Sequence, residues 1–333
     1  MSANKPKPTI AIVATGGTIA STAPSENQLS DYKVNSHGSD LVAAVPALTE
    51  LADYEFTQIC NVESHQINDE VLYPLATTIQ TLCDRQDVAA VVVTHGTDTL
   101  EETAYFLHLI VDTQKPIVLV GAMRPASALS ADGPLNLYHA VVVACHPDSV
   151  GKGVLVVMND RIASARHVTK GHANGVEAFV ATEFGYLGIV AGQWVKFQNQ
   201  IVCPHTAESE FKRIDLSSPL PAVDVIYDHQ GAGSHHFDAS VRSGARGIVL
   251  AATGQGSLSP QASAGVRLAQ ASGVTVVRSS RVWQGAIRHS VKDDTYGTVP
   301  AYTLNPPKAR VLLRLTLSLG LCREDIEACF TRY

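Results

Sequence analysis

Short runs of apolar residues alternate along the chain with longer stretches in which apolar residues recur at helical spacing. This alternation is typical of a parallel β-sheet covered by helices. We therefore predict an α/β protein, with a larger N-terminal domain of mostly parallel sheet and flanking helices and a smaller C-terminal α/β domain. The pattern predicts strands at 9–14, 90–93, 117–120, 154–158, 223–227, 247–250 and 274–277, and helices at about 69–84, 99–112, 134–145, 259–272 and 306–319.

The domain boundary is predicted from a change in pattern. The stretch 198–221 is polar, rich in proline and without a sustained period, as in a linker between domains. We therefore expect an N-terminal domain at 1–197 and a C-terminal domain at 222–333. A length of 333 residues agrees with two domains of about 150 residues each.

Charge excludes two classes of partner. The formal net charge is −6 and Lys and Arg are not clustered, whereas a nucleic-acid-binding protein or one held on an anionic membrane surface shows a basic face. No apolar run approaches the roughly 18 residues of a membrane-spanning helix. Charged residues make up only 17% of the chain, against about 25% in ordinary soluble domains, which indicates a surface covered by sister subunits.

The expected compartment is the cytoplasm. The two lysines near the N-terminus precede an apolar run of about six residues that leads into Thr-Gly-Gly without a cleavage site, so we predict a strand and no signal peptide. A signal removed before this numbering begins would make a periplasmic location possible. The 6 cysteines form no C-x-x-C pair, which predicts free thiols.

No cofactor or metal is expected. The chain contains no phosphate-binding G-x-x-x-x-G-K-[ST] loop, and no G-x-G-x-x-G follows the first predicted strand. The serine-hydrolase elbow G-x-S-x-G is also missing. The histidines show no H-E-x-x-H or similar metal-ligand spacing.

Reactive side chains follow the predicted strands. In an open α/β sheet, ligands bind outside the carboxyl ends of the strands. Thr18 follows the first strand in the sequence Thr-Gly-Gly-Thr, in which the paired glycines permit a tight turn and close backbone approach to a ligand. Thr97 and Asp98 follow the second strand, and Lys170 lies beyond the fourth. A hydroxyl needs a neighbouring base or a lysine of lowered pKa to act as a nucleophile, so these side chains predict a relay if the fold brings them together.

Thr97 and Asp98 are also expected beside a helix N-terminus. Thr99 and Glu102 have the T-x-x-E spacing of a capping box, in which the two side chains bond each other's backbone N–H groups. On its own this spacing indicates only the start of a helix.

Several segments, in order and nearly from end to end, resemble the bacterial L-asparaginases of the asparaginase/glutaminase family. The TGGTIA form resembles the type II branch. The resemblance implies a two-domain α/β fold, a homotetramer built as a dimer of intimate dimers, and hydrolysis of L-asparagine to L-aspartate and ammonia. The matching segments are ATGGTIA at 14–20, VVTHGTDTLEETAYFL at 92–107, VGAMRP at 120–125, ADGPLNLY at 131–138, GVLVVMND at 153–160, VVRSSRV at 276–282 and TLNPPKARVLL at 303–313.

The resemblance implies a role for each matching catalytic position. Thr18 resembles the nucleophile that forms an acyl-enzyme, and Tyr32 resembles the tyrosine of a lid that closes over the substrate. Thr97 and Lys170 resemble the second hydroxyl and its lysine partner. Asp98 resembles the carboxylate that holds the α-ammonium of the substrate by a charge-assisted hydrogen bond.

Among the other substrate-binding positions, one matches the family and three depart from it. Ser64 resembles the serine that binds the α-carboxylate, but the next residue, usually glutamine or glutamate, is His65. The C-terminal residue that reaches the neighbouring subunit's site is commonly asparagine and is here Ser257. Val291 aligns with a family glutamate that binds the ammonium, so either Asp293 replaces that glutamate or one carboxylate is missing.

A further departure concerns the family's common disulfide. Cys83 lies near one half of it, whereas the other position is Thr113, so we do not expect this bond.

The leading hypothesis is an L-asparaginase that acts through Thr18 and uses glutamine weakly. An alternative is a glutaminase-asparaginase or a related amide hydrolase of altered specificity, because a simple pocket discriminates one methylene by only about 1–3 kcal/mol. A second alternative is a non-catalytic protein that binds an amino acid. Release of ammonia from asparagine and from glutamine distinguishes the three.

Overall fold

A large mixed sheet forms the centre of the first of two units. The computed structural model describes residues 6–28, 30 and 33–333. Within these residues the large sheet has eight strands, of which β4, β1, β5, β6 and β7 run parallel and the rest are antiparallel. Its order is β12 (Trp194–Phe197), β11 (Gly188–Ala191), β8 (Arg161–Ser164), β7 (Val154–Met158), β6 (Ile117–Val120), β5 (Val88–Thr94), β1 (Thr9–Gly16) and β4 (Asp53–Val62).

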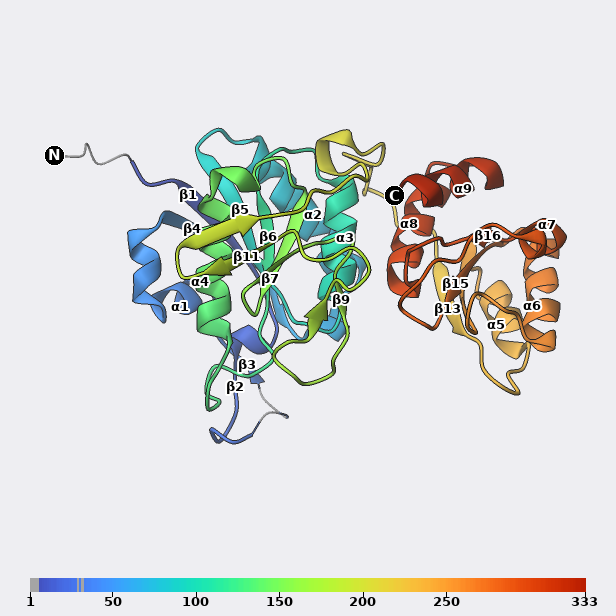
Figure 1. The fold of residues 1–333 in the computed structure, drawn as a ribbon, viewed down its shortest axis with the longest axis horizontal. Coiled ribbons are helices and arrows are strands. Elements are labelled where there is room, and N and C mark those ends of the chain that lie inside the picture. The colour runs from blue at the N-terminus through green and yellow to red at the C-terminus, as the bar shows by residue number, and fades with distance from the viewer. Residues whose placement is uncertain (1–5, 29, 31–32) are drawn as a thin grey trace. The chain divides into compact units, whose positions relative to one another are not determined.

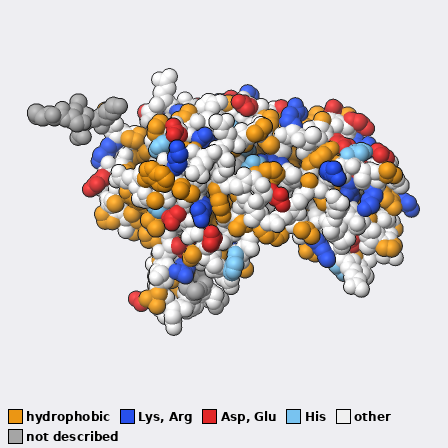
Figure 2. All heavy atoms as spheres, in the orientation of Figure 1, with side chains coloured by type: hydrophobic (Ala, Val, Ile, Leu, Met, Phe, Trp, Pro, Cys, Tyr) orange, Lys and Arg blue, Asp and Glu red, His pale blue; other side chains and the backbone are white. Residues whose placement is uncertain are grey.

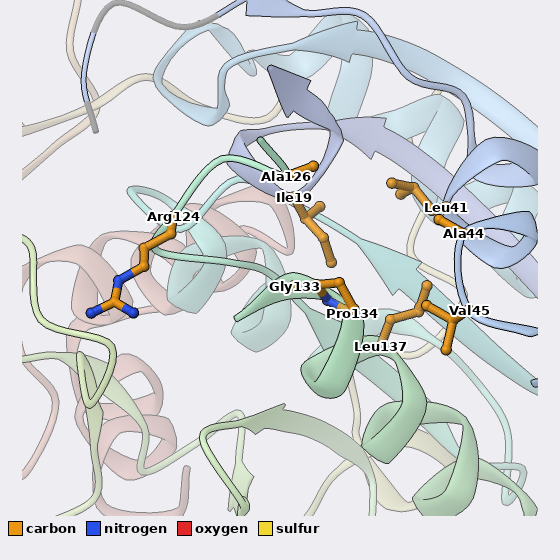
Figure 3. Close-up of a pocket in the computed structure, with 9 residues that line it drawn as sticks. All are labelled: Ile19, Leu41, Ala44, Val45, Arg124, Ala126, Gly133, Pro134 and Leu137. Carbon is orange, nitrogen blue, oxygen red and sulfur yellow. The ribbon is translucent and has the colours of Figure 1, made fainter. Parts of the chain in front are cut away.

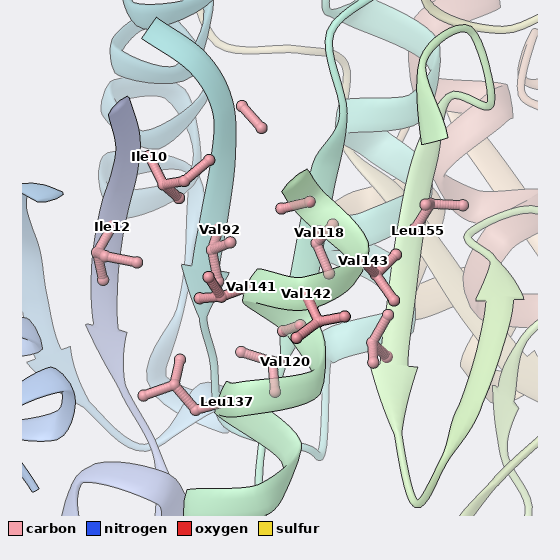
Figure 4. Close-up of a cluster of buried hydrophobic side chains, with 14 of the residues drawn as sticks. Ile10, Ile12, Val92, Val118, Val120, Leu137, Val141, Val142, Val143 and Leu155 are labelled. Carbon is pink, nitrogen blue, oxygen red and sulfur yellow. The ribbon is translucent and has the colours of Figure 1, made fainter. Parts of the chain in front are cut away.

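Helices cover this sheet (Figure 1). Helix α4 (Gly133–Cys145) packs against β5, β6 and β7, while α2 (Asp69–Asp84) and α3 (Leu100–Ile110) pack against β5 and β7, respectively. Figure 4 shows side chains of α4 and of the parallel strands pointing into one buried cluster. The strand β5 is buried on both faces, which explains its continuous apolar sequence.

The second unit has a parallel sheet of its own. Its order is β13-β14-β15-β16, and a separate apolar core lies between this sheet and its helices. Helix α8 packs against the first three of these strands. The elements are β13 (Val223–Tyr227), β14 (Gly247–Ala252), β15 (Thr275–Ser280), β16 (Val299–Pro300), α5 (His235–Arg242), α6 (Pro260–Ala271), α7 (Val291–Tyr296), α8 (Pro306–Ser318) and α9 (Arg323–Arg332).

Short elements complete the first unit. Strand β2 pairs with β3 and strand β9 pairs with β10, each antiparallel. These elements are α1 (Gly38–Ala43), β2 (Ser21–Thr22), β3 (Lys33–Val34), β9 (Thr169–Lys170) and β10 (Phe179–Val180), with 3-10 helices η1 (Thr18–Ala20), η2 (Pro46–Glu50), η3 (Ser64–Gln66), η4 (Pro147–Ser149) and η5 (Thr206–Glu208).

The predicted fold class is confirmed, and the two units are Met1–Ile214 and Asp215–Tyr333. Their boundary falls inside the segment 198–221, whose role as a linker stays a prediction. On the face that Figure 2 draws, basic and acidic side chains are interspersed. Within the described ranges, no helix has both the length and the apolar character needed to cross a membrane. No disulfide joins the cysteines, all of which are described.

Candidate active site

Thr18 stands on a turn that only glycine can build. Gly16 and Gly17 have φ angles of 100° and 84°, which side chains other than glycine rarely adopt. The backbone N–H of Gly17 donates to the carbonyl of Val62 in the neighbouring strand β4 over 2.9 Å. The turn therefore leaves the carboxyl end of β1 in a defined direction and places the buried Thr18 at the start of η1.

The turn of Thr18 touches the turn of Thr97 through backbone atoms. A Cβ atom built on Gly17 would lie only 2.3 Å from the Cα and N atoms of Gly96, so this contact leaves no room for a side chain on Gly17. Gly96 follows the end of β5, the strand that pairs with β1. Each contacting glycine is followed directly by a threonine, and these two threonines thus belong to adjoining turns.

The buried side chain of Ile19 packs η1 against the first unit. Ile19 is buried and its side chain approaches α4 where that helix begins at Gly133. A Cβ atom on Gly133 would lie 3.1 Å from Ile19 Cγ1, which shows how closely the two elements pack. Figure 3 shows Ile19 beside a small cavity of about 40 Å³ that is lined mainly by apolar residues, including Leu41 and Leu137. This packing holds the turn of Thr18 against the sheet.

Ser64 organises the N-terminus of α3. Its Oγ accepts hydrogen bonds from the N–H groups of Asp98 and Thr99, over 3.1 and 3.4 Å. Thr99 is the N-cap residue of α3, whose N–H has no partner within the helix, and Asp98 directly precedes it. Ser64 is buried, and its side chain packs against Gly96, where an added Cβ atom would lie 2.8 Å from Ser64 Oγ.

The capping box predicted for Thr99 is wrong in one respect. Thr99 is the N-cap residue of α3, but its side chain makes no hydrogen bond to the helix backbone. Its hydroxyl donates instead to the carbonyl of Ser64 over 2.8 Å. The 3-10 helix η3, which begins at Ser64, thus contacts this helix end through two groups of Ser64. Its hydroxyl accepts from backbone N–H groups, and its carbonyl accepts from the hydroxyl of Thr99.

The structure brings Thr97, Asp98 and Lys170 together. Lys170 Nζ donates to Thr97 Oγ1 over 3.0 Å and to Asp98 Oδ1 over 2.6 Å. Thr97 is buried, the Lys170 side chain is 15% exposed and the Asp98 side chain is 59% exposed. The ammonium group thus connects a sheltered hydroxyl with a carboxylate that solutes can reach.

Two histidines near these residues differ in their environment. His95 is completely buried, and burial lowers its pKa to about 4, although its hydrogen bond to the Gly96 carbonyl favours the charged form. The ring is therefore neutral at physiological pH, and its Nδ1–H donates to that carbonyl over 2.7 Å. His65 is exposed, beside Ser64, and its Nδ1 lies 3.4 Å from Glu63 Oε2. Its imidazole is open to solution at the position where the family usually has glutamine or glutamate.

The remaining predicted site residues are Tyr32, Ser257 and Val291. Tyr32 falls outside the described residues. Ser257 belongs to the second unit, where it is exposed and closes a short turn by bonding with Thr253. Val291 is 78% exposed at the start of α7.

Asp293 is enclosed within the second unit. Arg278 Nε donates to its Oδ1 over 2.9 Å, and the same guanidinium contacts Oδ2 over 2.5 Å. Thr298 and the backbone of Ser290 donate to the same carboxylate over 2.7 and 2.9 Å. Burial alone would raise the pKa of Asp293, but these hydrogen bonds and the positive charge of Arg278 hold the pKa below its usual value. Both oxygens are thus engaged in the interior.

Two features escaped the sequence analysis. Glu101 is a buried carboxylate that bonds to the strand carrying Lys170, and Arg278 is a buried guanidinium that bonds to the backbone of the turn before Ser257. Glutamate and arginine are usually exposed, so neither position carries a signal in the sequence. Among the residues with described placement, no group of three or more His, Cys, Asp or Glu side chains could hold a metal ion.

Comparison with known proteins gives matches over both units. The family described as "Asparaginase, N-terminal" matches residues 9–203, and "Glutaminase/Asparaginase C-terminal domain" matches residues 222–330. The protein named L-asparaginase 2 of Bacillus subtilis strain 168 is 46% identical, over 100% of this chain and 88% of its own. A glutaminase-asparaginase of Acinetobacter glutaminasificans is 42% identical, over 98% of this chain and 100% of its own.

A solved structure agrees with these matches. It is described as that of a probable cytoplasmic L-asparaginase from Campylobacter jejuni and superposes with a TM-score of 0.95. It is 41% identical in sequence and covers 98% of this chain and 100% of its own. The structural match covers 98% of the chain and therefore includes both units.

Proposed function

Because the chain belongs to the asparaginase family, we propose that it is an amidohydrolase that converts L-asparagine to L-aspartate and ammonia, with Thr18 as the nucleophile. One observation carries this proposal. The turn of Thr18 lies against the turn of Thr97 through their glycines, and Lys170 donates to the hydroxyl of Thr97. Two hydroxyls with a lysine partner are the parts that hydroxyl-based nucleophilic catalysis requires.

The reaction proceeds in two balanced steps. In the first step, Thr18 Oγ bonds to the side-chain amide carbon and gives up its proton, while the amide nitrogen gains a proton and leaves as ammonia. In the second step, the oxygen of a water molecule bonds to the acyl carbon, one proton of that water returns to Thr18 Oγ, and aspartate leaves. Splitting hydrolysis into two displacements is the advantage of a covalent intermediate. Thr97 and Lys170 together exchange the protons, and Tyr32 relays the first one.

The α groups of the substrate have partners at the N-terminus of α3. Ser64 Oγ already accepts from two backbone N–H groups, so its own proton is the one that it offers to an α-carboxylate. Asp98, with a largely exposed side chain, binds the α-ammonium by a charge-assisted hydrogen bond. His65 stands beside Ser64 and tunes the binding of both charged groups.

In our proposal, this chain lacks the family glutamate that aligns with Val291. Val291 occupies its position, and Asp293 is committed to Arg278 inside the second unit. Ser257 reaches into the site of a neighbouring subunit in a homotetramer, a dimer of intimate dimers. Light scattering on the purified chain tests this assembly: a particle with the mass of one chain would contradict it. The proposed compartment is the cytoplasm, which fractionation of the producing cells tests.

A glutaminase-asparaginase is the second candidate. Two features favour it. A relative of that name is 42% identical over 98% of this chain, and the chain carries His65 and Val291 at two positions where the resemblance implies substrate-binding side chains of another kind. A non-catalytic protein of this family would bind the amino acid and release no ammonia from it.

One assay separates these functions. Ammonia release by the purified full chain is measured with L-asparagine and with L-glutamine as substrates. We expect a kcat/KM for asparagine well above that for glutamine. Comparable values for both amides would favour the glutaminase-asparaginase, and binding of asparagine without ammonia release would refute the hydrolase.

A further inference from the structure

A buried glutamate connects the two segments that carry the Lys170 relay. Glu101 lies in the first turn of α3 and is only 8% exposed. Its Oε2 accepts from Thr169 Oγ1 over 2.6 Å, and its Oε1 accepts from the backbone N–H of Lys170 over 3.3 Å. Burying a carboxylate is costly unless hydrogen bonds compensate it, and here both oxygens bond to the same short strand.

The strand that carries Lys170 is short. β9 consists of Thr169 and Lys170 alone, and it pairs with the equally short β10. A two-residue ladder fixes a backbone weakly, since isolated pairs of strands are marginal even when they are longer. Lys170 also has a long and flexible side chain, so the position of its ammonium depends on how firmly its backbone is held.

Glu101 thereby makes a second connection between the same partners. The side chain of Lys170 reaches to Thr97 and Asp98, which lie in the loop just before α3. Glu101 reaches from the first turn of α3 back to the backbone of Lys170. One connection joins the side chain of Lys170 to the loop before α3, and the other joins a side chain of α3 to the backbone of Lys170. Together they restrain the distance from Lys170 Nζ to Thr97 Oγ1.

We propose that Glu101, acting with Thr169, is a positioning residue that holds Lys170 Nζ on the hydroxyl of Thr97 and so determines kcat. The proposal rests on the function proposed above. Catalytic geometry is sensitive to small displacements, and misplacement by about 1 Å costs about 100-fold in rate. The hydrogen bond between Ser64 and the backbone of Asp98 does not involve Glu101, so substrate binding is expected to persist when the Glu101 carboxylate is removed.

The first test compares neighbouring glutamates. In Glu101→Ala we expect kcat for asparagine to fall by about 100-fold with KM within about twofold. Glu102→Ala is the matched control, because it removes the same charge from the same first turn of α3 and so loses the same interaction with the helix dipole. Its kcat is expected within about twofold of the parent value. Equal kcat in the two variants would overturn the proposal.

Thr169 provides a test that changes no charge. Thr169→Val removes the hydroxyl donated to Glu101 and nearly keeps the volume, so kcat falls, by less than in Glu101→Ala. Thr169→Ser restores the hydroxyl and is expected to restore kcat to within about threefold of the parent. A serine variant as slow as the valine variant would show that the methyl group matters and not the hydrogen bond.

Non-additivity separates positioning from mere stability. If Glu101 acts through Lys170, Glu101→Ala adds no further loss of kcat in a Lys170→Met background, measured in single turnover at high enzyme concentration. A loss equal to that in the parent would contradict the proposal. If Glu101→Ala folds poorly, kcat is compared instead in the nearly isosteric Glu101→Gln and in the variants Thr169→Val and Thr169→Ser. Failure of the parent enzyme to hydrolyse asparagine would instead refute the proposed function.

Discussion

Lys170 Nζ lies 3.0 Å from the hydroxyl of Thr97, although 73 positions separate the two residues in the sequence. Thr97 follows the buried strand β5, and Lys170 belongs to the short strand β9. The fold thus joins a buried central strand to a two-residue strand through this hydrogen bond.

Lys170→Met should lower kcat for asparagine by at least about 100-fold, because Thr97 loses the group that exchanges its proton. The methionine keeps most of the side-chain length without the ammonium. Lys196→Met serves as the control, since Lys196 is an exposed lysine of β12. Ammonia release at saturating asparagine gives kcat, and near-parental turnover of the Lys170 variant would remove this lysine from catalysis.

Thr18→Ala should reduce turnover by several orders of magnitude while the assembly and the melting temperature remain unchanged. The substitution deletes the proposed nucleophile, whereas the glycine turn and the packing of Ile19 hold the backbone. Thr18→Ser keeps a hydroxyl and should retain measurable turnover. Mass spectrometry of the parent enzyme, quenched during turnover, should find the acyl adduct on Thr18. Activity of the alanine variant within tenfold of the parent would contradict this role.

Val291→Glu should lower KM for asparagine by about tenfold, because a hydrogen bond to a charged group contributes about 1.5–3 kcal/mol. Val291 is 78% exposed at the start of α7 in the second unit, so a glutamate there would not disturb a packed core. Val291→Gln is the matched control, which has nearly the same shape and no charge. Steady-state kinetics give both constants, and an unchanged KM in the glutamate variant would mean that another acid already holds the ammonium.

Asp293→Asn should lower the free energy of unfolding by about 3–5 kcal/mol, since it leaves the buried Arg278 without a countercharge. Asp294→Asn is the control: Asp294 is the next residue, its side chain is 64% exposed and its ion pair with His289 is at the surface, where such pairs contribute about 0–1 kcal/mol. Urea unfolding at pH 7 measures both. Equal losses in the two variants would contradict the importance of the buried pair.

The same carboxylate predicts a pH dependence of stability. The pKa of Asp293 is lowered in the folded chain, so the folded state favours the ionised form. Its contribution is present above the usual pKa of 3.8 and is lost as the pH falls below 3.8 toward the folded pKa. The difference in stability between the parent and Asp293→Asn should therefore shrink below about pH 4. A difference that stays constant down to pH 2 would contradict the assignment.

Regular elements could be predicted best where burial is complete. The pattern predicts the helix α2 to its ends, because it is strongly periodic, and it predicts the strand β5 as 90–93 within the observed Val88–Thr94, because that part is a continuous apolar run. The strand β4 was not predicted: it is the edge strand of the sheet, none of its residues is fully buried, and its sequence mixes polar and apolar side chains. The six-residue helix α7 is too short to show a period.

The candidate site was predictable only in part. The rule that ligands bind at the carboxyl ends of strands indicated Thr18, Thr97 and Asp98, and the structure places all three there. Nothing in the pattern tells which of two adjacent glutamates in α3 faces the strand of Lys170. The same holds for Asp293, for which the sequence left open a role at the substrate, whereas the structure binds it to Arg278. Such pairings depend on contacts between distant segments.

The contact between Gly17 and Gly96 has a consequence for how this enzyme can change over evolutionary time. The turns that carry Thr18 and Thr97 touch through main-chain atoms: a Cβ atom added at Gly17 would press on Gly96, and one added at Gly96 would press on Ser64. If the function proposed above holds, selectivity for one amide or another would change through substitutions at the exposed His65 and Val291, which leave this contact untouched.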